Sequence, residues 1–141
     1  MNGELLIRNS KQNKESLDFF VSELPRLLGC CPWEERESSN YIEERYYCCF
    51  VLGLRATVSI ADDDSDFPDY QFLLYLDPEF LRSDTAFLAE LADCVARKLV
   101  VNGYEVLRPF DSLRPGNGGL LYQFDPTAGT MPWEQVITQM V

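Results

Sequence analysis

Apolar residues recur with the period of an α-helix between positions 17 and 28, and acidic and serine residues occupy the opposite side. The apolar stripe comprises Leu17, Phe20, Val21, Leu24 and Leu28. We predict a helix here that Asn13 caps at its N-terminus. Pro25 is expected to kink or restart this helix, because proline lacks the backbone N–H that the helix ladder needs.

A second helical period lies in the middle of the chain. Its apolar stripe comprises Leu88, Leu91, Ala92, Val95 and Leu99. Ser83 or Asp84 is the expected N-cap, and the helix should run to about Asn102 because Gly103 follows as a C-terminal stop signal.

Aromatic-rich or alternating apolar segments predict strands on both sides of an acidic connection. Tyr41 to Leu52 is rich in strand-favouring residues, Gly53 supplies a turn, and Leu54 to Ala61 alternates between apolar and polar positions. Tyr70 to Asp77 alternates in the same way, so these three segments predict an antiparallel meander with one buried face.

The flanking segments give weaker signals. Residues 30–40 are expected to form an irregular crossing, and residues 104–107 and 120–124 are short strand candidates on either side of a turn-rich loop. Thr130 is expected to cap a short last helix through residues 132–137.

This order of elements predicts the α+β class. We expect a two-layer fold, an antiparallel β-meander with helices packed on one face, in a single globular domain over residues 1–141. The other face should carry Arg55, Thr57, Ser59, Gln71, Leu73 and Tyr75, and receive Tyr47, Cys49 and Val51 from the first strand. Tyrosines among polar neighbours are typical of recognition surfaces.

The charge of the chain is concentrated. Ten of the 23 acidic residues fall between Asp62 and Asp93, where Arg82 is the one basic residue. The densest part, residues 62–70, connects two predicted strands, so a cationic partner would relieve the repulsion among its carboxylates. A formal net charge of −11 argues against direct binding to nucleic acid or to an anionic membrane. The competing interpretation is a solvated turn without a partner.

The residues expected of common catalytic and metal sites are missing. The chain contains no histidine, which excludes Ser–His–Asp triads, Cys–His pairs and histidine metal sites. Asp62, Asp64 and Asp66 match the start of a calcium loop, but Phe67 replaces its turn glycine and Leu73 its bidentate acid. We therefore expect no cofactor and no organised metal site, with a weak, open cation site as the alternative.

The cysteines and the N-terminus indicate a location. Five cysteines, an odd number that includes two adjacent pairs in apolar contexts, favour reduced, buried and structurally passive thiols. The start of the chain has three apolar residues before polar sequence resumes, and no stretch approaches membrane-spanning length. We expect a cytoplasmic protein.

The residues Glu43-Glu44-Arg45-Tyr46-Tyr47 and Asp62 to Tyr70, within a small acidic domain that lacks histidine, resemble bacterial immunity proteins of polymorphic-toxin systems. The resemblance implies an inhibitor that blocks a cationic toxin acting in the cytoplasm, foremost a nuclease, by imitating its phosphate substrate. The contact residues would be the carboxylates of Asp62, Asp63, Asp64, Asp66 and Asp69 and the aromatic rings of Phe67, Tyr70, Tyr46, Tyr47 and Tyr75.

Two other functions remain open at this point. The same acidity would serve an adaptor or chaperone for a basic secretion client, which would leave the activity of that client intact. A small cytosolic enzyme with carboxylate or thiol chemistry would instead need a concave pocket with a perturbed acid or an accessible cysteine. For each function we expect a monomer or a weak homodimer.

Overall fold

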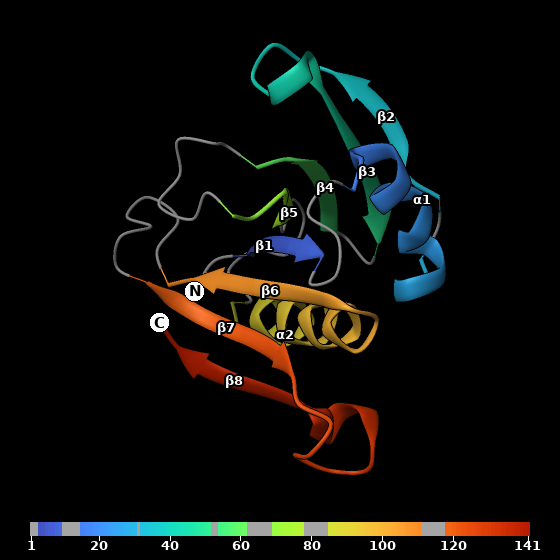
Figure 1. Cartoon of the computed structure of the whole chain (residues 1–141). Helices are drawn as coiled ribbons and strands as arrows, with labels where there is room; N and C mark the ends of the chain where they lie inside the picture. Colours follow the sequence, from blue (N-terminus) through green and yellow to red (C-terminus); the bar gives the residue numbers. More distant parts are fainter. Residues whose placement is uncertain are drawn as a thin grey trace.

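A computed structural model describes residues 3–9, 15–30, 32–51, 54–61, 69–77, 85–110 and 118–141 (Figure 1). The helices are α1 (Leu17–Leu28) and α2 (Thr85–Val101), with 3₁₀ turns η1 (Ile42–Glu44) and η3 (Pro132–Gln135). The strands are β1 (Glu4–Asn9), β2 (Glu34–Glu37), β3 (Arg45–Val51), β4 (Leu54–Ile60), β5 (Phe72–Asp77), β6 (Tyr104–Pro109), β7 (Gly119–Phe124) and β8 (Val136–Met140).

All the strands join one antiparallel sheet in the order β2-β3-β4-β5-β1-β6-β7-β8. The predicted α+β class and the meander through β3, β4 and β5 are confirmed. The N-terminal strand β1 was not predicted, although it lies in the centre, between β5 and β6. Helix α2 connects β5 to β6 across β1, so the two halves of the sheet are held together by this central strand.

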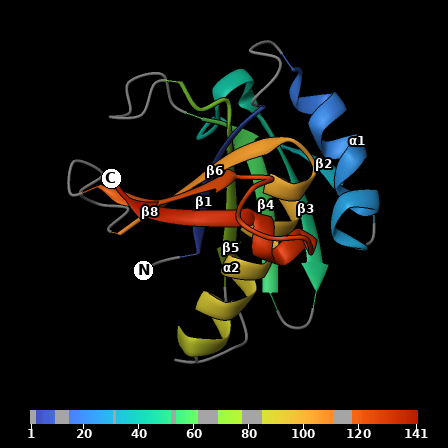
Figure 2. The ribbon, with the colours of Figure 1, turned by 60° about the horizontal axis from the view of Figure 1, so that its bottom comes forward.

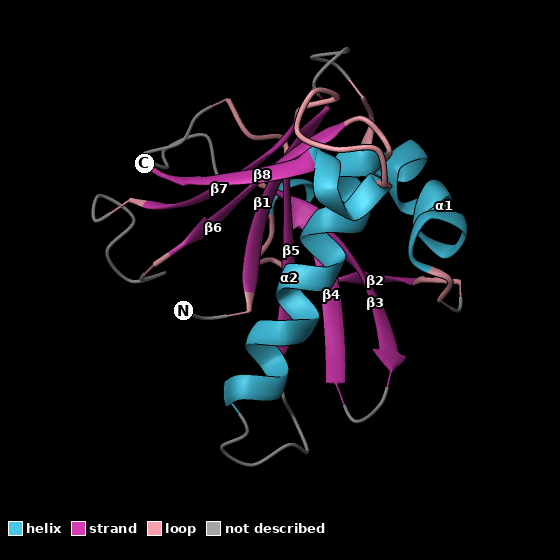
Figure 3. Cartoon of the chain, turned by 90° about the horizontal axis from the view of Figure 1, so that it is seen from below, coloured by secondary structure: helices cyan, strands magenta, loops and turns pink. Residues whose placement is uncertain are grey.

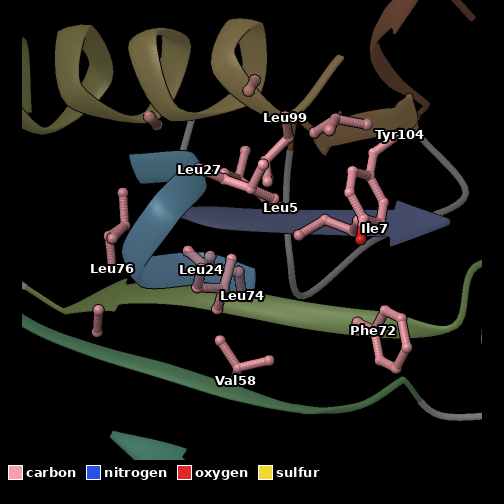
Figure 4. Packing of buried hydrophobic residues seen from close by; sticks show 14 of the residues in the cluster. Leu5, Ile7, Leu24, Leu27, Val58, Phe72, Leu74, Leu76, Leu99 and Tyr104 are labelled. Atoms are coloured by element: carbon pink, nitrogen blue, oxygen red, sulfur yellow. The ribbon is translucent and has the colours of Figure 1, made fainter. Parts of the chain in front are cut away.

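Both helices pack on one face of the sheet, as predicted (Figure 3). Their apolar stripes meet Leu5 and Ile7 of β1 and the inward residues of β4, β5 and β6. Figure 4 shows this cluster between the strands and the helices, and Phe20 of α1 stacks on Phe72 of β5 with ring centroids 4.5 Å apart. The buried apolar surface of this layer is the main stabilising contribution to the fold.

The helix ends follow local signals, with one cap misplaced. Ser16, and not Asn13, caps α1, because its hydroxyl oxygen accepts a hydrogen bond from the Phe19 N–H at 3.1 Å. The helix continues through Pro25, so the predicted restart is wrong. Gly103 follows α2 with a φ of 99°, which confirms it as the stop. The expected caps Asn13, Ser83 and Asp84 lie outside the described residues.

Three segments differ from prediction. Residues 34–37 form the edge strand β2 rather than an irregular crossing, because backbone pairing with β3 does not need apolar side chains. The strand expected from Tyr41 begins at Arg45, after the turn η1. The expected last helix is only the turn η3, and the chain then extends as β8 along β7, where Val136 is buried in the core.

The register of β3 corrects the predicted composition of the open face. Tyr47 pairs with Val58 and Cys49 pairs with Ala56, so the side chains of each pair lie on the same side of the sheet. Val58 and Ala56 belong to the core beneath the helices, so Tyr47 and Cys49 face the helices, and the expectation that they lie on the open face is wrong. The side chain of Val51 lies outside the described part of the chain. Cys48 lies on the open face instead, next to Thr57.

Candidate protein-binding surface

The open face of the sheet is the one that neither helix covers. It carries Tyr46, Cys48 and Phe50 from β3, Arg55, Thr57 and Ser59 from β4, and Leu73, Tyr75 and Asp77 from β5. Tyr41 stacks on Tyr46 with ring centroids 4.5 Å apart, and Phe50 is 57% exposed. The face thus offers aromatic contact area with little side-chain freedom to lose. The sequence predicted Tyr75 on this face, whereas Tyr46 was predicted only as a contact residue and takes the place expected for Tyr47.

Tyr70 is held in a network on this open face. Its hydroxyl donates to Glu105 Oε1 at 3.1 Å, and Arg8 Nη2 donates to Glu105 Oε2 at 2.9 Å. The Arg8 guanidinium also lies 5.5 Å from the centroid of the Tyr70 ring. Burial and the adjacent Glu105 carboxylate raise the pKa of Tyr70. The ring packs with Leu73 over a second apolar cluster that comprises Leu6, Ala61, Leu107 and Leu121.

Carboxylates gather where β3 begins and β1 and β4 end. One hollow of about 660 Å³ is lined by Glu15, Glu43 and Asp69, and a second of about 460 Å³ by Glu35, Glu37, Glu43 and Glu44. The two hollows share Glu43 and Arg45 in their linings and are therefore adjacent. We call the six lining carboxylates of Glu15, Glu35, Glu37, Glu43, Glu44 and Asp69 the acidic rim.

Two guanidinium groups, those of Arg8 and Arg45, line the same hollows. Arg8 is bound to Glu105, outside the acidic rim, whereas Arg45 binds Glu43 at 3.0 Å. Within the described ranges, Glu35, Glu37 and Glu44 form no ion pair. The acidic rim consequently keeps an excess of uncompensated negative charge.

Asp18 fastens helix α1 to the strand that carries this rim. Its carboxylate accepts a hydrogen bond from Arg45 Nη1 at 2.6 Å and a short one from the Tyr47 hydroxyl. The hydrogen bond from Tyr47, together with Arg45, lowers the pKa of Asp18, and the same bond raises the pKa of Tyr47 to about 12. Tyr47 thus positions the beginning of β3 rather than serving as an exposed anchor on the open face.

The acidic turn has a strained backbone. Glu43 and Glu44 adopt φ values of 59° and 56°, in the left-handed region that side chains other than glycine rarely occupy. Hydrogen bonds from Ser38 N to Glu44 O and from Glu44 N to Tyr41 O, both 2.9 Å, hold this conformation. Such strain costs on the order of 1–3 kcal/mol per residue and is often found at functional sites.

Most of the acidic connection predicted to contact a partner lies outside the described residues. These residues are Asp62, Asp63, Asp64, Asp66 and Phe67. The ends of the connection are placed: Ala61 N donates to Gln71 O and Gln71 N donates to Ile7 O, both at 2.9 Å. Asp69, the first described residue after it, belongs to the acidic rim. The connection therefore leaves and re-enters the fold beside the acidic rim.

A polar network under β7 was missed in the sequence. Tyr122 is fully buried, and its hydroxyl donates to Asp93 Oδ1 at 2.8 Å and accepts from Arg108 Nη1 at 3.3 Å. Arg97 Nε binds Asp93 Oδ2 at 2.9 Å. Burial opposes the shift, but the hydrogen bonds from Arg97 and Tyr122 lower the pKa of Asp93. The four-residue spacing of Asp93 and Arg97 on a helix was the available signal.

The described thiols and carboxylates form no metal site. Cys48 and Cys49 are buried on opposite faces of β3 and Cys30 is half-buried, but Cys94 is exposed, so the expectation of buried thiols is wrong for Cys94. Cys31 lies outside the described residues. In the described part of the chain, His, Cys, Asp and Glu residues form no group of three or more that could hold a metal ion.

Comparisons with known proteins add no relative. No protein-family model, no curated protein and no solved structure matches this chain. Among the described residues, neither helix is both long and apolar enough to cross a membrane.

Proposed function

We propose that this chain is an immunity-type inhibitor that binds and blocks a cationic toxin, most specifically a nuclease that acts in the cytoplasm. The observation that carries the proposal is the acidic rim, in which six carboxylates line two adjacent hollows. A nuclease must attract phosphate groups, so its active cleft is cationic, and an array of carboxylates at one end of a rigid sheet complements such a cleft.

The acidic rim has the support that a rigid binding surface needs. Its carboxylates come from the α1 entry, the β2–β3 hairpin and the start of β5, which the sheet and the Asp18–Arg45 ion pair hold in place. The strained turn at Glu43 and Glu44 keeps two of them in a backbone conformation that a relaxed loop would leave. Residues that are fixed before binding lose little conformational entropy in the complex.

The experiment begins with the gene neighbourhood. The reading frame immediately upstream would be expressed, and its toxicity and nuclease activity measured with and without an equimolar amount of this chain. We expect inhibition at a ratio of one to one. Binding without inhibition would indicate an adaptor instead, and an upstream product that is neither bound nor toxic would overturn the proposal.

A matched pair of charge reversals tests the surface. Asp69→Lys and Glu90→Lys change the net charge equally, but Asp69 lies in the acidic rim and Glu90 is exposed on α2. We expect Asp69→Lys to slow association by about ten-fold at low salt, with a smaller effect at high salt, and Glu90→Lys to act only through net charge. Stopped-flow association rates at two salt concentrations measure this, and equal effects of the two reversals would contradict a role for the acidic rim.

A further inference from the structure

The two edge strands of the sheet, β2 and β8, lie at opposite ends of it (Figure 1) and differ in charge. In the edge strand β2, all the residues, Glu34 to Glu37, are charged and exposed. The other edge strand, β8 (Val136–Met140), has no charged side chain. Charged residues on an edge strand deter pairing with another chain, because pairing would press them against the backbone of that chain and remove their hydration. Of these two edge strands, only β2 is protected in this way.

Exposed apolar residues concentrate beside β8. Of the ten large apolar residues that are exposed in the described ranges, six lie between positions 124 and 141. They are Phe124, Met131, Trp133, Ile137, Met140 and Val141. Glu134 is the one charged side chain among residues 126–141, in a chain whose formal net charge is −11. Two copies can therefore approach each other at the edge strand β8 with less electrostatic repulsion than at the acidic rim.

The hydrogen-bond pattern shows which residues of β8 direct their backbone groups away from the described part of the sheet. Val141 and Gly119 exchange two hydrogen bonds, of 3.0 and 3.3 Å, so Gln139 and Ile137 also direct their backbone groups toward β7. By the same alternation, Thr138 and Met140 direct theirs away from the sheet. The outward carbonyl of Val136 is occupied, since Arg97 Nη1 donates to it at 3.4 Å.

We propose that the edge strand β8, which comes forward in Figure 2, pairs antiparallel with β8 of a second copy of this chain. Thr138 exchanges hydrogen bonds with Met140 of the second copy, and Gln139 lies opposite its own counterpart on the twofold axis. A twofold contact needs a surface that complements itself. An uncharged strand between apolar side chains meets this condition, whereas β2 paired with itself would set glutamates against glutamates.

Cysteine cross-linking tests both the contact and its register, in a Cys94→Ser background that removes the one exposed thiol among the described cysteines. Residues at a non-hydrogen-bonded antiparallel pair have Cα atoms about 4.5 Å apart, within disulfide range, so Gln139→Cys should cross-link two copies. Ile137→Cys is the matched control on the same face, because in this register the two copies of residue 137 lie roughly 13 Å apart. We expect oxidation to cross-link Gln139→Cys at least ten-fold faster, as seen on a non-reducing gel. Equal rates would overturn the register.

Sedimentation gives the second test. At about 1 M salt, where the Debye length is about 3 Å, we expect the chain to approach twice its mass of 16.2 kDa as concentration rises. Thr138→Pro removes an N–H that points away from β7, so it should give a folded monomer, and Met140→Lys should weaken the dimer while leaving the backbone intact. A wild-type chain that stays monomeric, or a dimer that both variants leave unchanged, would overturn the proposal. Neither variant alters the acidic rim, so toxin inhibition should persist in both.

Discussion

At the scale of single residues, the acidic turn is where local preference and observed conformation disagree. Glu44 has no ion pair in the described part of the chain and keeps a left-handed backbone, although glycine would adopt that conformation without cost. The strain and the exposed carboxylate occur at the same position. We therefore infer that the strained backbone at Glu44 lowers the stability of the fold and at the same time fixes the position of this carboxylate.

Two substitutions separate the strain from the charge. Glu44→Gly and Glu44→Ala both remove the carboxylate, but only glycine relieves the left-handed strain. The free energy of unfolding of Glu44→Gly should therefore be about 1 kcal/mol higher than that of Glu44→Ala, and its unfolding midpoint should lie at a higher urea concentration. Both should slow association with the cationic partner to the same extent. Urea titrations and association rates measure the two effects. If Glu44→Ala were the more stable of the two, the turn would be unstrained.

The signal in the sequence for each element depended on how many of its faces are buried. Strands β4 and β5 alternate, because one face meets the helices, and α1 and α2 show apolar stripes for the same reason. Strand β1 has the buried run Leu5-Leu6-Ile7, with neighbours on both edges and apolar clusters on both faces, so it gives no alternation. Strand β2 consists of charged residues and gives no signal.

The central position of β1 makes a prediction about stability. Leu5 is fully buried between the halves of the sheet, and Leu5→Ala should lower the free energy of unfolding by about 2–5 kcal/mol, because it removes buried methyl groups and leaves a cavity. Phe50→Ala is the control, since Phe50 is apolar but 57% exposed on β3 and should change stability by less than about 1 kcal/mol. Urea unfolding measures both, and losses of equal size would mean that β1 is not central to the core.

The sequence predicted the parts of the candidate surface that lie on or beside strands with an apolar pattern. Asp69, Tyr46 and Tyr75 were predicted as contact residues, and the structure places Asp69 in the acidic rim and both tyrosines on the open face. The proximity of Asp69 to the β2–β3 hairpin was not predicted, because it depends on β2, which pairs with β3 but carries no apolar pattern. Tyr47 was assigned to the wrong face because the register across the two-residue connection was not worked out.

At the scale of the whole molecule, charge and apolar surface are separated along the sheet. The acidic rim lies beside β2 and β3, and the uncharged edge strand β8 lies at the opposite end of the strand order. The proposed cationic partner and the proposed second copy would thus occupy opposite ends of the sheet and would not compete with each other. Tyr122, Asp93 and Arg97 stabilise the second end by connecting α2 to β7 and β8.

Buried tyrosines determine how the whole molecule responds to alkaline pH. Burial is the main cause that raises the pKa of Tyr70, Tyr104 and Tyr122, and hydrogen bonds to Glu105, Glu15 and Asp93 act in the same direction. Unfolded tyrosine titrates near pH 10, as a model-peptide pKa of about 10 indicates. The folded chain therefore holds these protons at a pH where the unfolded chain releases them.

The sign of the effect follows directly. A raised pKa in the folded state contributes stability that is complete below about pH 10 and is lost as the pH rises through the folded values, by at most about 1.4 kcal/mol per pH unit for each tyrosine. We expect the free energy of unfolding to fall steadily above about pH 10, and to fall less steeply in Tyr104→Phe, which has no proton to retain. Urea unfolding between pH 9 and about 11.5, with tyrosinate absorbance as a second signal, measures the slope. An equal slope in Tyr104→Phe would show that its burial and its hydrogen bond to Glu15 do not control this titration.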